Sequence, residues 1–359
     1  MPTQIRTVAG FALLAGLSAM QAQTAGTPRS HPWWNDRPVG GRAYTTDAGK
    51  MPLISVKGNQ FIDPQGGVIL FRGLSISDPD KLEIEGHWNR EHFVKVKEMG
   101  ARVVRIPVHP VAWRGRTPAE YLKLLDQAVK WCTDLDMYID LDWHSIGNLA
   151  TGVFQDPMYE TSLPETYNFW RIMARHYAGH HTVAFFELFN EPTTYHDQLG
   201  PASWEEWKKI NENLIAIVRS NQAQAIPLVA GFDWAYDLTP LRQGPIAAEG
   251  IGYVTHPYAH KRERPWEPKW EEDFGFAAGK YPILATEFGG FPAPRQAAAG
   301  APVEAGYGPS IIKYLEGKGI SWMVWCFDPE WGPTLIADWN YTLTASGEFA
   351  RQAMHGAVQ

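Results

Sequence analysis

The sequence has little cysteine and no surplus of basic residues, and each shortage argues against a class of protein. Only Cys132 and Cys326 occur among 359 residues, and two thiols cannot form a structural zinc site alone. We expect Cys132 in an outer helix and Cys326 in a final strand, so both should be free and buried. Lys and Arg number 32 against 39 Asp and Glu. That balance leaves no excess positive charge to neutralise phosphates, which argues against nucleic-acid partners.

Motifs for metal and nucleotide chemistry are also missing. The chain has no HExxH, EF-hand or GxxxxGK[ST] pattern. Each of these patterns places specific ligands or a phosphate-binding loop at fixed spacing. We therefore expect no metal ion and no cofactor.

One apolar run of moderate length occurs, and it lies at the N-terminus. Arg6 precedes the apolar residues 8–19, which are too few to span a bilayer comfortably, and small residues follow at 19–25. This order predicts a signal peptide over residues 1–22. A membrane anchor or a fraying helix is the alternative. No other segment is apolar enough to cross a membrane, so we expect a secreted protein, extracellular or periplasmic, that is monomeric and free of the membrane after cleavage.

The rest of the chain divides into an arm and one large domain. Residues 23–50 are rich in Pro, Gly, Thr and Arg without a sustained period, which indicates a linker or wrapping arm. Residues 51–359 follow as the main domain, and 53–66 predict a hairpin with a turn at Gly58-Asn59. The 16 Trp exceed what a core of this size needs. We expect several of them to be exposed as platforms on which sugars stack.

After the hairpin, strand-like and helix-like segments alternate. Eight short apolar runs predict buried strands at 68–74, 102–108, 136–143, 183–189, 226–232, 250–256, 282–288 and 321–327. Helix-like runs separate most of them, at 88–99, 118–134, 165–178, 203–219, 308–317 and 345–354, with weaker candidates at 237–248 and 267–279. The alternation implies a parallel sheet, either a doubly wound open sheet or a closed barrel. The count of eight and the lack of a Gly-rich phosphate loop favour an α/β fold of the (β/α)8 TIM-barrel type with an N-terminal hairpin.

Polar and aromatic side chains gather at the C-terminal ends of these strands, where a barrel of this type carries its active site. They are Arg105, His144, Asn190, Glu191, His256, Tyr258, Glu287 and Trp325. Two of them are carboxylates at the ends of apolar strands. Glu191 ends the run at 183–191 and Glu287 ends the run at 281–287. A pair of acids brought together at such an edge is the arrangement that cleaves a glycosidic bond.

The chain resembles glycoside hydrolase family 5, the cellulase family of clan A, from about residue 53 to the C-terminus. The matching motifs are FRGLSISDP (71–79), RVVRIPV (102–108), DLDWHS (140–145), ELFNEP (187–192), THPY (255–258), ATEFGG (285–290) and WMVWCFDPEW (322–331). An NEP element combined with a later Glu at a strand end is quite specific. The eight strand-end residues show no departure from the family pattern.

The resemblance implies a role for each strand-end residue. Glu191 would be the general acid and then the general base, with its pKa raised by its surroundings. Glu287 would be the ionised nucleophile, oriented by Arg105 and Tyr258. Asn190 would bind the sugar 2-hydroxyl and His144 another hydroxyl of the same sugar. His256 would belong to the polar network around the carboxylates, and Trp325 would form the stacking floor.

Simpler interpretations stay open for several residues. The alternative for Arg105 is to neutralise a buried acid such as Glu187 or Asp142, and the alternative for His144, His256 and Trp325 is a structural role. Asp140 and Asp142 are expected as a hydrogen-bonded structural pair. We interpret His109 and the basic run 261–264 as solvated loop rather than site, although the loop that carries 261–264 follows the sixth strand and could reach ligand. Trp234 and four other loop tryptophans are candidates to stack on further sugar units: Trp113, Trp266, Trp270 and Trp331.

Together these features predict a secreted, metal-independent, retaining endo-β-1,4-glycoside hydrolase acting on a polysaccharide or oligosaccharide. Cellulose-type or mixed-linkage β-glucan is the expected substrate. A β-mannanase or another β-glycanase of the same family is the alternative, because the eight shared residues handle chemistry common to all of them. A non-catalytic carbohydrate-binding barrel is the alternative from another class.

Overall fold

The computed structural model describes residues 32–291 and 306–357. The chain divides into a first unit, Met1–Trp33, and a second unit, Trp34–Gln359. The predicted signal peptide at 1–22 lies outside the described residues, and so do residues 23–31 of the predicted arm. Among the described residues, no helix has the length and apolar character needed to cross a bilayer.

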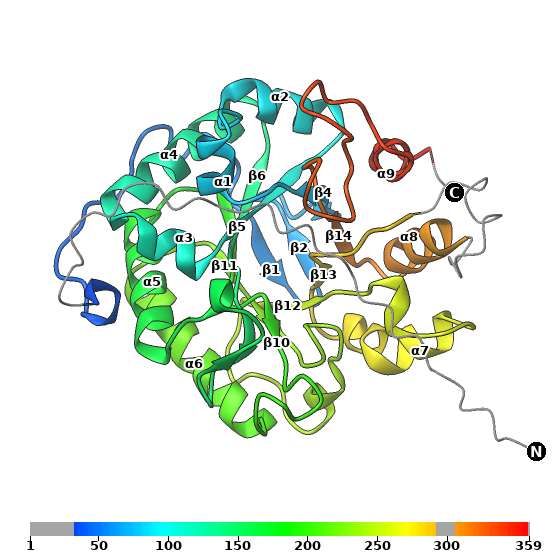
Figure 1. The fold of residues 1–359 in the computed structure, drawn as a ribbon. Coiled ribbons are helices and arrows are strands. Elements are labelled where there is room, and N and C mark those ends of the chain that lie inside the picture. The colour runs from blue at the N-terminus through cyan, green and yellow to red at the C-terminus, as the bar shows by residue number, and fades with distance from the viewer. Residues whose placement is uncertain (1–31, 292–305, 358–359) are drawn as a thin grey trace, which may run out of the picture. The chain divides into compact units, whose positions relative to one another are not determined.

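The second unit is built around eight parallel strands that close into a barrel (Figure 1), in the order β11-β12-β13-β14-β4-β5-β6-β9. Their bounds are β4 (Arg72–Ser75), β5 (Val103–Val108), β6 (Tyr138–Trp143), β9 (Val183–Glu187), β11 (Ile226–Ala230), β12 (Gly252–Thr255), β13 (Ile283–Ala285) and β14 (Ser321–Val324). Each coincides with one of the eight predicted runs, and only β4 extends past its run, by the single residue Ser75. All but Arg72 of their residues are buried, as expected for strands covered on both faces. The predicted (β/α)8 barrel is confirmed.

Helices surround the barrel and cover its strands (Figure 1). The α-helices are α1 (Pro79–Ile84), α2 (Arg90–Glu98), α3 (Pro110–Gly115), α4 (Pro118–Asp134), α5 (Leu163–His176), α6 (Trp204–Ser220), α7 (Glu267–Asp273), α8 (Tyr307–Gly317) and α9 (Ala345–Met354). Short 3-10 turns are η1 (Trp33–Asn35), η2 (Pro157–Tyr159), η3 (Thr239–Arg242), η4 (Ala259–Lys261) and η5 (Gly275–Gly279). Helix α4 starts where Thr117-Pro118 predicts, because Thr117 and Glu120 form a reciprocal capping box. The weak prediction at 237–248 was largely wrong, since only the four residues of η3 are helical there.

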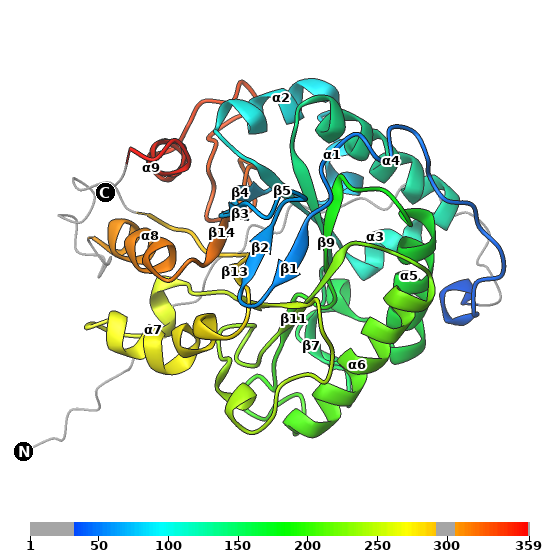
Figure 2. The same cartoon turned by 180° about the vertical axis from the view of Figure 1, so that it is seen from behind.

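The predicted hairpin closes the base of the barrel. Strands β1 (Ser55–Lys57) and β2 (Gln60–Ile62) pair antiparallel, β3 (Val68–Ile69) joins them, and Figure 2 shows the hairpin across the rear of the barrel. Phe61 of β2 packs edge-on against Phe71 and Phe185, with ring centroids 6.1 and 5.2 Å away. These rings belong to the apolar cluster that fills this end of the barrel. The polar strand ends therefore lie over a closed, hydrophobic base.

A small second sheet lies beyond the ends of β6 and β9. It contains β7 (Ile146–Asn148), β8 (Val153–Phe154) and β10 (Glu191–Pro192), in the order β10-β7-β8. Both cysteines are buried and unpaired, as expected.

Candidate active site

Glu191 is fixed by backbone pairing at the end of β9. Glu191 pairs with Ile146 in the small sheet, and the Glu191 N–H donates to the Ser145 carbonyl at 3.0 Å. The preceding residue, Asn190, donates its own N–H to the Trp143 carbonyl at 3.1 Å. The segment after β9 is thereby tied to the segment after β6. Glu191 is held at the mouth by main-chain bonds rather than by a flexible loop.

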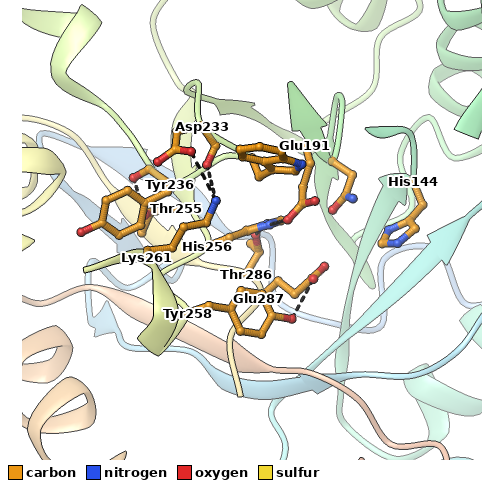
Figure 3. Close-up of polar contacts among 12 residues, drawn as sticks. His144, Glu191, Asp233, Tyr236, Thr255, His256, Tyr258, Lys261, Thr286 and Glu287 are labelled. Atoms are coloured by element: carbon orange, nitrogen blue, oxygen red, sulfur yellow. Dashed lines mark hydrogen bonds and ion pairs between the residues drawn. The ribbon is translucent and has the colours of Figure 1, made fainter. Parts of the chain in front are cut away.

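Glu287 approaches Glu191 from the end of β13 (Figure 3). One carboxylate oxygen from each glutamate and one ring nitrogen of His256 all lie within 4.8 Å of one another. Glu191 is 8% exposed and Glu287 is 7% exposed. The two carboxyl groups therefore share one small opening, as the sequence predicts.

Arg105 on β5 is the cationic centre beneath these acids, and it is fully buried. Its guanidinium donates to Glu287 Oε2 at 3.0 Å, to both oxygens of Glu187 at 2.9 Å, and to Asn190 Oδ1 at 2.6 Å. Asp142 Oδ2 lies 3.0 Å from the same group. Arg105 thus neutralises Glu187 and Asp142, as the simpler interpretation holds, and also contacts the candidate nucleophile.

Glu287 receives a second hydrogen bond from the Tyr258 hydroxyl, 2.8 Å from Oε1. Burial raises the pKa of Glu287, while the positive charges of His256 and Arg105 act in the opposite direction. Both carboxylate oxygens are therefore engaged by donors that favour the ionised form.

In the side-chain amide of Asn190, the oxygen is hydrogen-bonded and the nitrogen is not, within the residues that the structure describes. Its Oδ1 accepts from Arg105, which fixes the amide orientation. Its Nδ2 is buried and has no hydrogen-bond partner in the described part of the chain. Because an unpaired buried donor is costly, this N–H₂ is available to a ligand hydroxyl in the opening.

His256 lies between the acids with acceptors on both sides of its ring. Its Nδ1 is 3.0 Å from Glu191 Oε1, and its Nε2 is 3.0 Å from the Thr286 hydroxyl. Burial is the largest single influence and would lower the pKa of His256. The negative charge of Glu287 and the hydrogen bonds to Glu187 and Glu191 together outweigh burial, and the pKa rises to about 9. His256 is therefore an imidazolium near neutral pH.

This raised pKa predicts a pH-dependent contribution to folding. A histidine in the unfolded chain titrates near pH 6.5. The stabilisation that charged His256 adds to the free energy of unfolding is therefore complete below about that pH and is lost as pH rises through about 9. We expect the difference in unfolding free energy between wild type and His256→Gln to shrink by on the order of 3 kcal/mol over that interval. Urea unfolding at pH 6, 7.5 and 9.5 measures it, with exposed His355→Gln as control. A difference that stays constant with pH would show that His256 is not charged in the folded protein.

His144 and Trp325 lie together on another flank of the opening. His144 Nδ1 is 2.6 Å from Asp142 Oδ2, so Asp142 fixes the orientation of the ring. Burial lowers the pKa of His144 well below its usual value. The Trp325 ring lies parallel to it, with centroids 5.3 Å apart and planes 4° apart. Both residues border the opening rather than the hydrophobic base.

A cavity of about 610 Å³ adjoins the glutamates on the opposite flank from His144 in Figure 3. Trp234 lines it, as predicted, and lies in a run of three left-handed residues, Asp233–Ala235, with φ of 55° to 58°. Such a conformation costs about 1–2 kcal/mol per residue. Lys261 holds the turn by donating to the Asp233 carbonyl at 2.7 Å and by lying 4.5 Å from the Trp234 ring centroid.

Two predictions about loops at the mouth and one about strand β6 were wrong. Lys261 is only 10% exposed and lines the cavity, so the run 261–264 is not simply solvated. Trp113, Trp266 and Trp270 are buried in aromatic packing and cannot serve as sugar platforms. Asp140 makes no hydrogen bond to Asp142, and its buried carboxyl oxygens have no partner among the described residues. Burial accordingly raises the pKa of Asp140 well above its usual value.

Two residues near the opening were not recognised as candidate site residues from the sequence. His109 is 3% exposed, contrary to the solvated-loop interpretation, and its ring lies 4.5 Å from that of His144. Tyr159 of η2 stacks beside His109 and is close enough to Glu191 and Glu287 for their charges to raise its pKa, although burial contributes more. His109 directly follows the end of β5, a position that could have marked it. Tyr159 carries no comparable signal.

Comparison with known proteins agrees with this geometry. The model of the cellulase family, glycosyl hydrolase family 5, matches residues 66–330. The chain is 26% identical over 221 residues to endoglucanase A of Butyrivibrio fibrisolvens, a match covering 59% of this chain and 47% of that protein. It is 24% identical over 327 residues to an endoglucanase of Clostridium saccharobutylicum, covering 88% of this chain and 67% of that protein. The chain thus spans about half the length of the Butyrivibrio relative.

A solved structure provides a more similar relative. A β-glucanase from Saccharophagus degradans, crystallised in complex with cellotetraose, is 43% identical with a TM-score of 0.84. The match covers 92% of this chain and all of that chain. With the family model matching well over half of the sequence, the chain belongs to glycosyl hydrolase family 5, the cellulase family.

Proposed function

We propose that the protein is a retaining endo-β-glucanase that hydrolyses internal β-1,4 bonds of cellulose-type or mixed-linkage glucan. The observation that carries the proposal is the approach of Glu191 and Glu287 to within 4.8 Å, measured between carboxylate oxygens. Retaining glycosidases hold their two carboxyl groups about 5–5.5 Å apart, whereas inverting enzymes leave about 6.5–9.5 Å for a water molecule. The narrow separation supports direct attack by one carboxylate. Family membership and the cellotetraose bound to the Saccharophagus β-glucanase support the substrate class.

The proposed reaction proceeds by two displacements. Glu191 donates its proton to the leaving glycosidic oxygen while Glu287 attacks the anomeric carbon, so the old C–O bond breaks as a glycosyl ester forms. Glu191, now ionised, takes a proton from water. The resulting hydroxide displaces Glu287, and the product has the configuration of the substrate.

The surrounding residues support these steps from where they lie. Arg105 and Tyr258 donate to the two oxygens of Glu287, which favours its ionised form and directs it. The free Nδ2 of Asn190 is suited to bind the 2-hydroxyl, a contact that strengthens as positive charge develops on the sugar ring. His144 is suited to a further hydroxyl and Trp325 to stacking beneath the cleaved sugar. Trp234 is suited to stack on a unit of the leaving group in the cavity beside Glu191.

Product stereochemistry tests this proposal. During hydrolysis of cellotetraose, we expect proton NMR to show new reducing ends first as the β-anomer, in excess over the equilibrium mixture. Mutarotation then restores the mixture. Parallel digests of carboxymethyl cellulose, barley β-glucan, galactomannan, xyloglucan and laminarin identify the preferred polymer, and product lengths identify internal cleavage. Initial release of the α-anomer would contradict the double displacement. Binding without any bond cleavage would indicate a carbohydrate-binding barrel instead.

We propose in addition that the protein is exported as a monomer. The basic Arg6, the apolar residues 8–19 and the small residues that follow support a signal peptide over residues 1–22. Residues 23–50 would then form an arm that precedes the catalytic domain at 51–359. Expression with the native N-terminus should give mature protein beginning near residue 23, determined by mass spectrometry of the exported chain. An exported chain that retains residue 1 would contradict the cleavage.

A further inference from the structure

His109 and His144 form two Asp–His pairs of the same design. Each histidine follows directly after a barrel strand, β5 for His109 and β6 for His144. His109 Nδ1 lies 3.0 Å from Asp78 Oδ2, and His144 Nδ1 lies 2.6 Å from Asp142 Oδ2. The two imidazole rings are neighbours, with centroids 4.5 Å apart. Whatever ligand touches one ring therefore passes close to the other.

Asp78 is built to hold His109 in one orientation. Besides the ring nitrogen, its carboxylate accepts from the His109 N–H at 2.8 Å and the Tyr121 hydroxyl at 2.7 Å. The Asp80 N–H donates to it as well, at 2.7 Å. Because its other three partners all donate, the carboxylate acts as an acceptor, and this favours the His109 tautomer that carries its proton on Nδ1. The ring cannot rotate without losing this contact.

The second ring nitrogen of His109 has no such partner. Neither His109 Nε2 nor His144 Nε2 makes a hydrogen bond within residues 32–291 and 306–357, and neither is among the buried polar atoms that lack one. Each Nε2 therefore retains contact with solvent although each residue is less than 5% exposed. A ring that is otherwise buried presents one polar atom to the opening. This is the geometry of a ligand contact.

Four rings, from His109, His144, Trp325 and Trp331, form a continuous four-ring wall. The ring centroids are 4.5 Å apart for His109 and His144 and 5.3 Å apart for His144 and Trp325. They are 6.1 Å apart for Trp325 and Trp331 and 5.1 Å apart for Trp331 and His109. Glu191 and Glu287 both line the cavity of about 610 Å³. The proposed function places Trp325, one member of the wall, beneath the cleaved sugar, which lies on the non-reducing side of the cleaved bond. None of the four wall residues lines that cavity, and Figure 3 places His144 across the glutamates from Lys261. The wall therefore borders the sugars on the non-reducing side of the cleaved bond.

We propose that His109 is a second substrate-binding histidine, whose Nε2 hydrogen-bonds a hydroxyl of the glucan on the non-reducing side of the cleaved bond. Asp78 is a positioning residue that acts through His109. This inference rests on the proposed β-glucanase function. It assigns to the segment after β5 a role in holding the chain while the segment after β6, through His144, holds the reacting sugar.

Two amide substitutions separate binding from structure. In His109→Asn, the side-chain amide can replace Nδ1 and keep the bond to Asp78, but nothing replaces Nε2. In His109→Gln, the longer side chain can replace Nε2. With cellotetraose as substrate, we expect kcat/KM to fall about tenfold in His109→Asn and less than about threefold in His109→Gln, as the loss of one ligand hydrogen bond implies. Thermal unfolding should show the reverse order, with His109→Asn at least as stable as His109→Gln.

The outcomes distinguish the inference from the function on which it depends. If His109→Asn is as active as wild type, or more active than His109→Gln, His109 has only a structural role and the inference is overturned. The same holds if His109→Gln fails to fold while His109→Asn folds and remains active. If wild type cleaves none of the glucans, the proposed function fails. Calorimetric titration of both variants with cellotetraose in a Glu287→Gln background then still reports whether Nε2 contributes to binding, with the same order of affinities expected.

Discussion

Replacing Glu287 by Ala should lower kcat on cellotetraose on the order of 10⁴-fold or more, because no other group can form the covalent intermediate. The deletion leaves a space next to the anomeric carbon and leaves the proposed general acid, Glu191, in place. Added azide should enter that space and attack an activated aryl cellobioside. The product should be the α-glycosyl azide, since a single displacement inverts the configuration. NMR of the isolated azide measures this outcome.

The Glu287→Ala result has a matched control in Glu263→Ala, which removes an exposed acid from the loop after β12. That control should keep the wild-type rate and form no azide adduct. If Glu287→Ala kept more than about a hundredth of wild-type kcat, or gave the β-azide, Glu287 would not be the nucleophile.

Replacing Glu191 by Ala should produce a loss that depends on the leaving group. Proton donation contributes about 10²–10⁴-fold when the departing oxygen is a sugar alkoxide, so kcat on cellotetraose should fall by that amount. A dinitrophenyl cellobioside needs little protonation, and its first step should be nearly unaffected. The second step should then limit turnover because no base activates water. A burst of dinitrophenolate, measured by stopped-flow absorbance, should therefore appear only in the variant.

Azide gives the complementary result for Glu191→Ala. It needs no general base, so it should restore turnover and yield the β-glycosyl azide through two inversions. The alkaline limb of the pH–rate profile should also disappear, because the group whose deprotonation stops catalysis is gone. Equal losses on cellotetraose and on the dinitrophenyl substrate, or formation of the α-azide, would rule out Glu191 as acid and base.

Periodic apolar patterns were sufficient to predict the elements that form the barrel. Eight short apolar runs became eight strands, and residues 118–134 became α4 with the predicted bounds. Residues 237–248 failed because their apolar positions, such as Leu238, Leu241 and Ile246, are buried by a turn rather than by a helix. The short helices α1 and α3 were missed. A segment of six residues gives too little periodicity to recognise.

Some residues of the site could be predicted from their own position in the sequence, whereas others depend on contacts that only the fold creates. Strand-end positions marked Glu191, Glu287 and their neighbours, because a parallel barrel places all such ends at one mouth. His109 was missed because its meaning depends on Asp78, 31 residues earlier, and on a ring contributed by β6. Loop tryptophans were overvalued for the same reason. Nothing in the sequence around Trp270 indicates that Trp266, Tyr307 and Tyr314 enclose it.

The aromatic plug that the hairpin places under the barrel has a consequence for how a polymer is handled. With Phe61, Phe71 and Phe185 packed together there, no passage follows the barrel axis through the residues that the structure describes. A glucan bound as we propose would therefore have to reach the carboxylates from the side of the strand ends. Both products of its cleavage would have to leave on that same side.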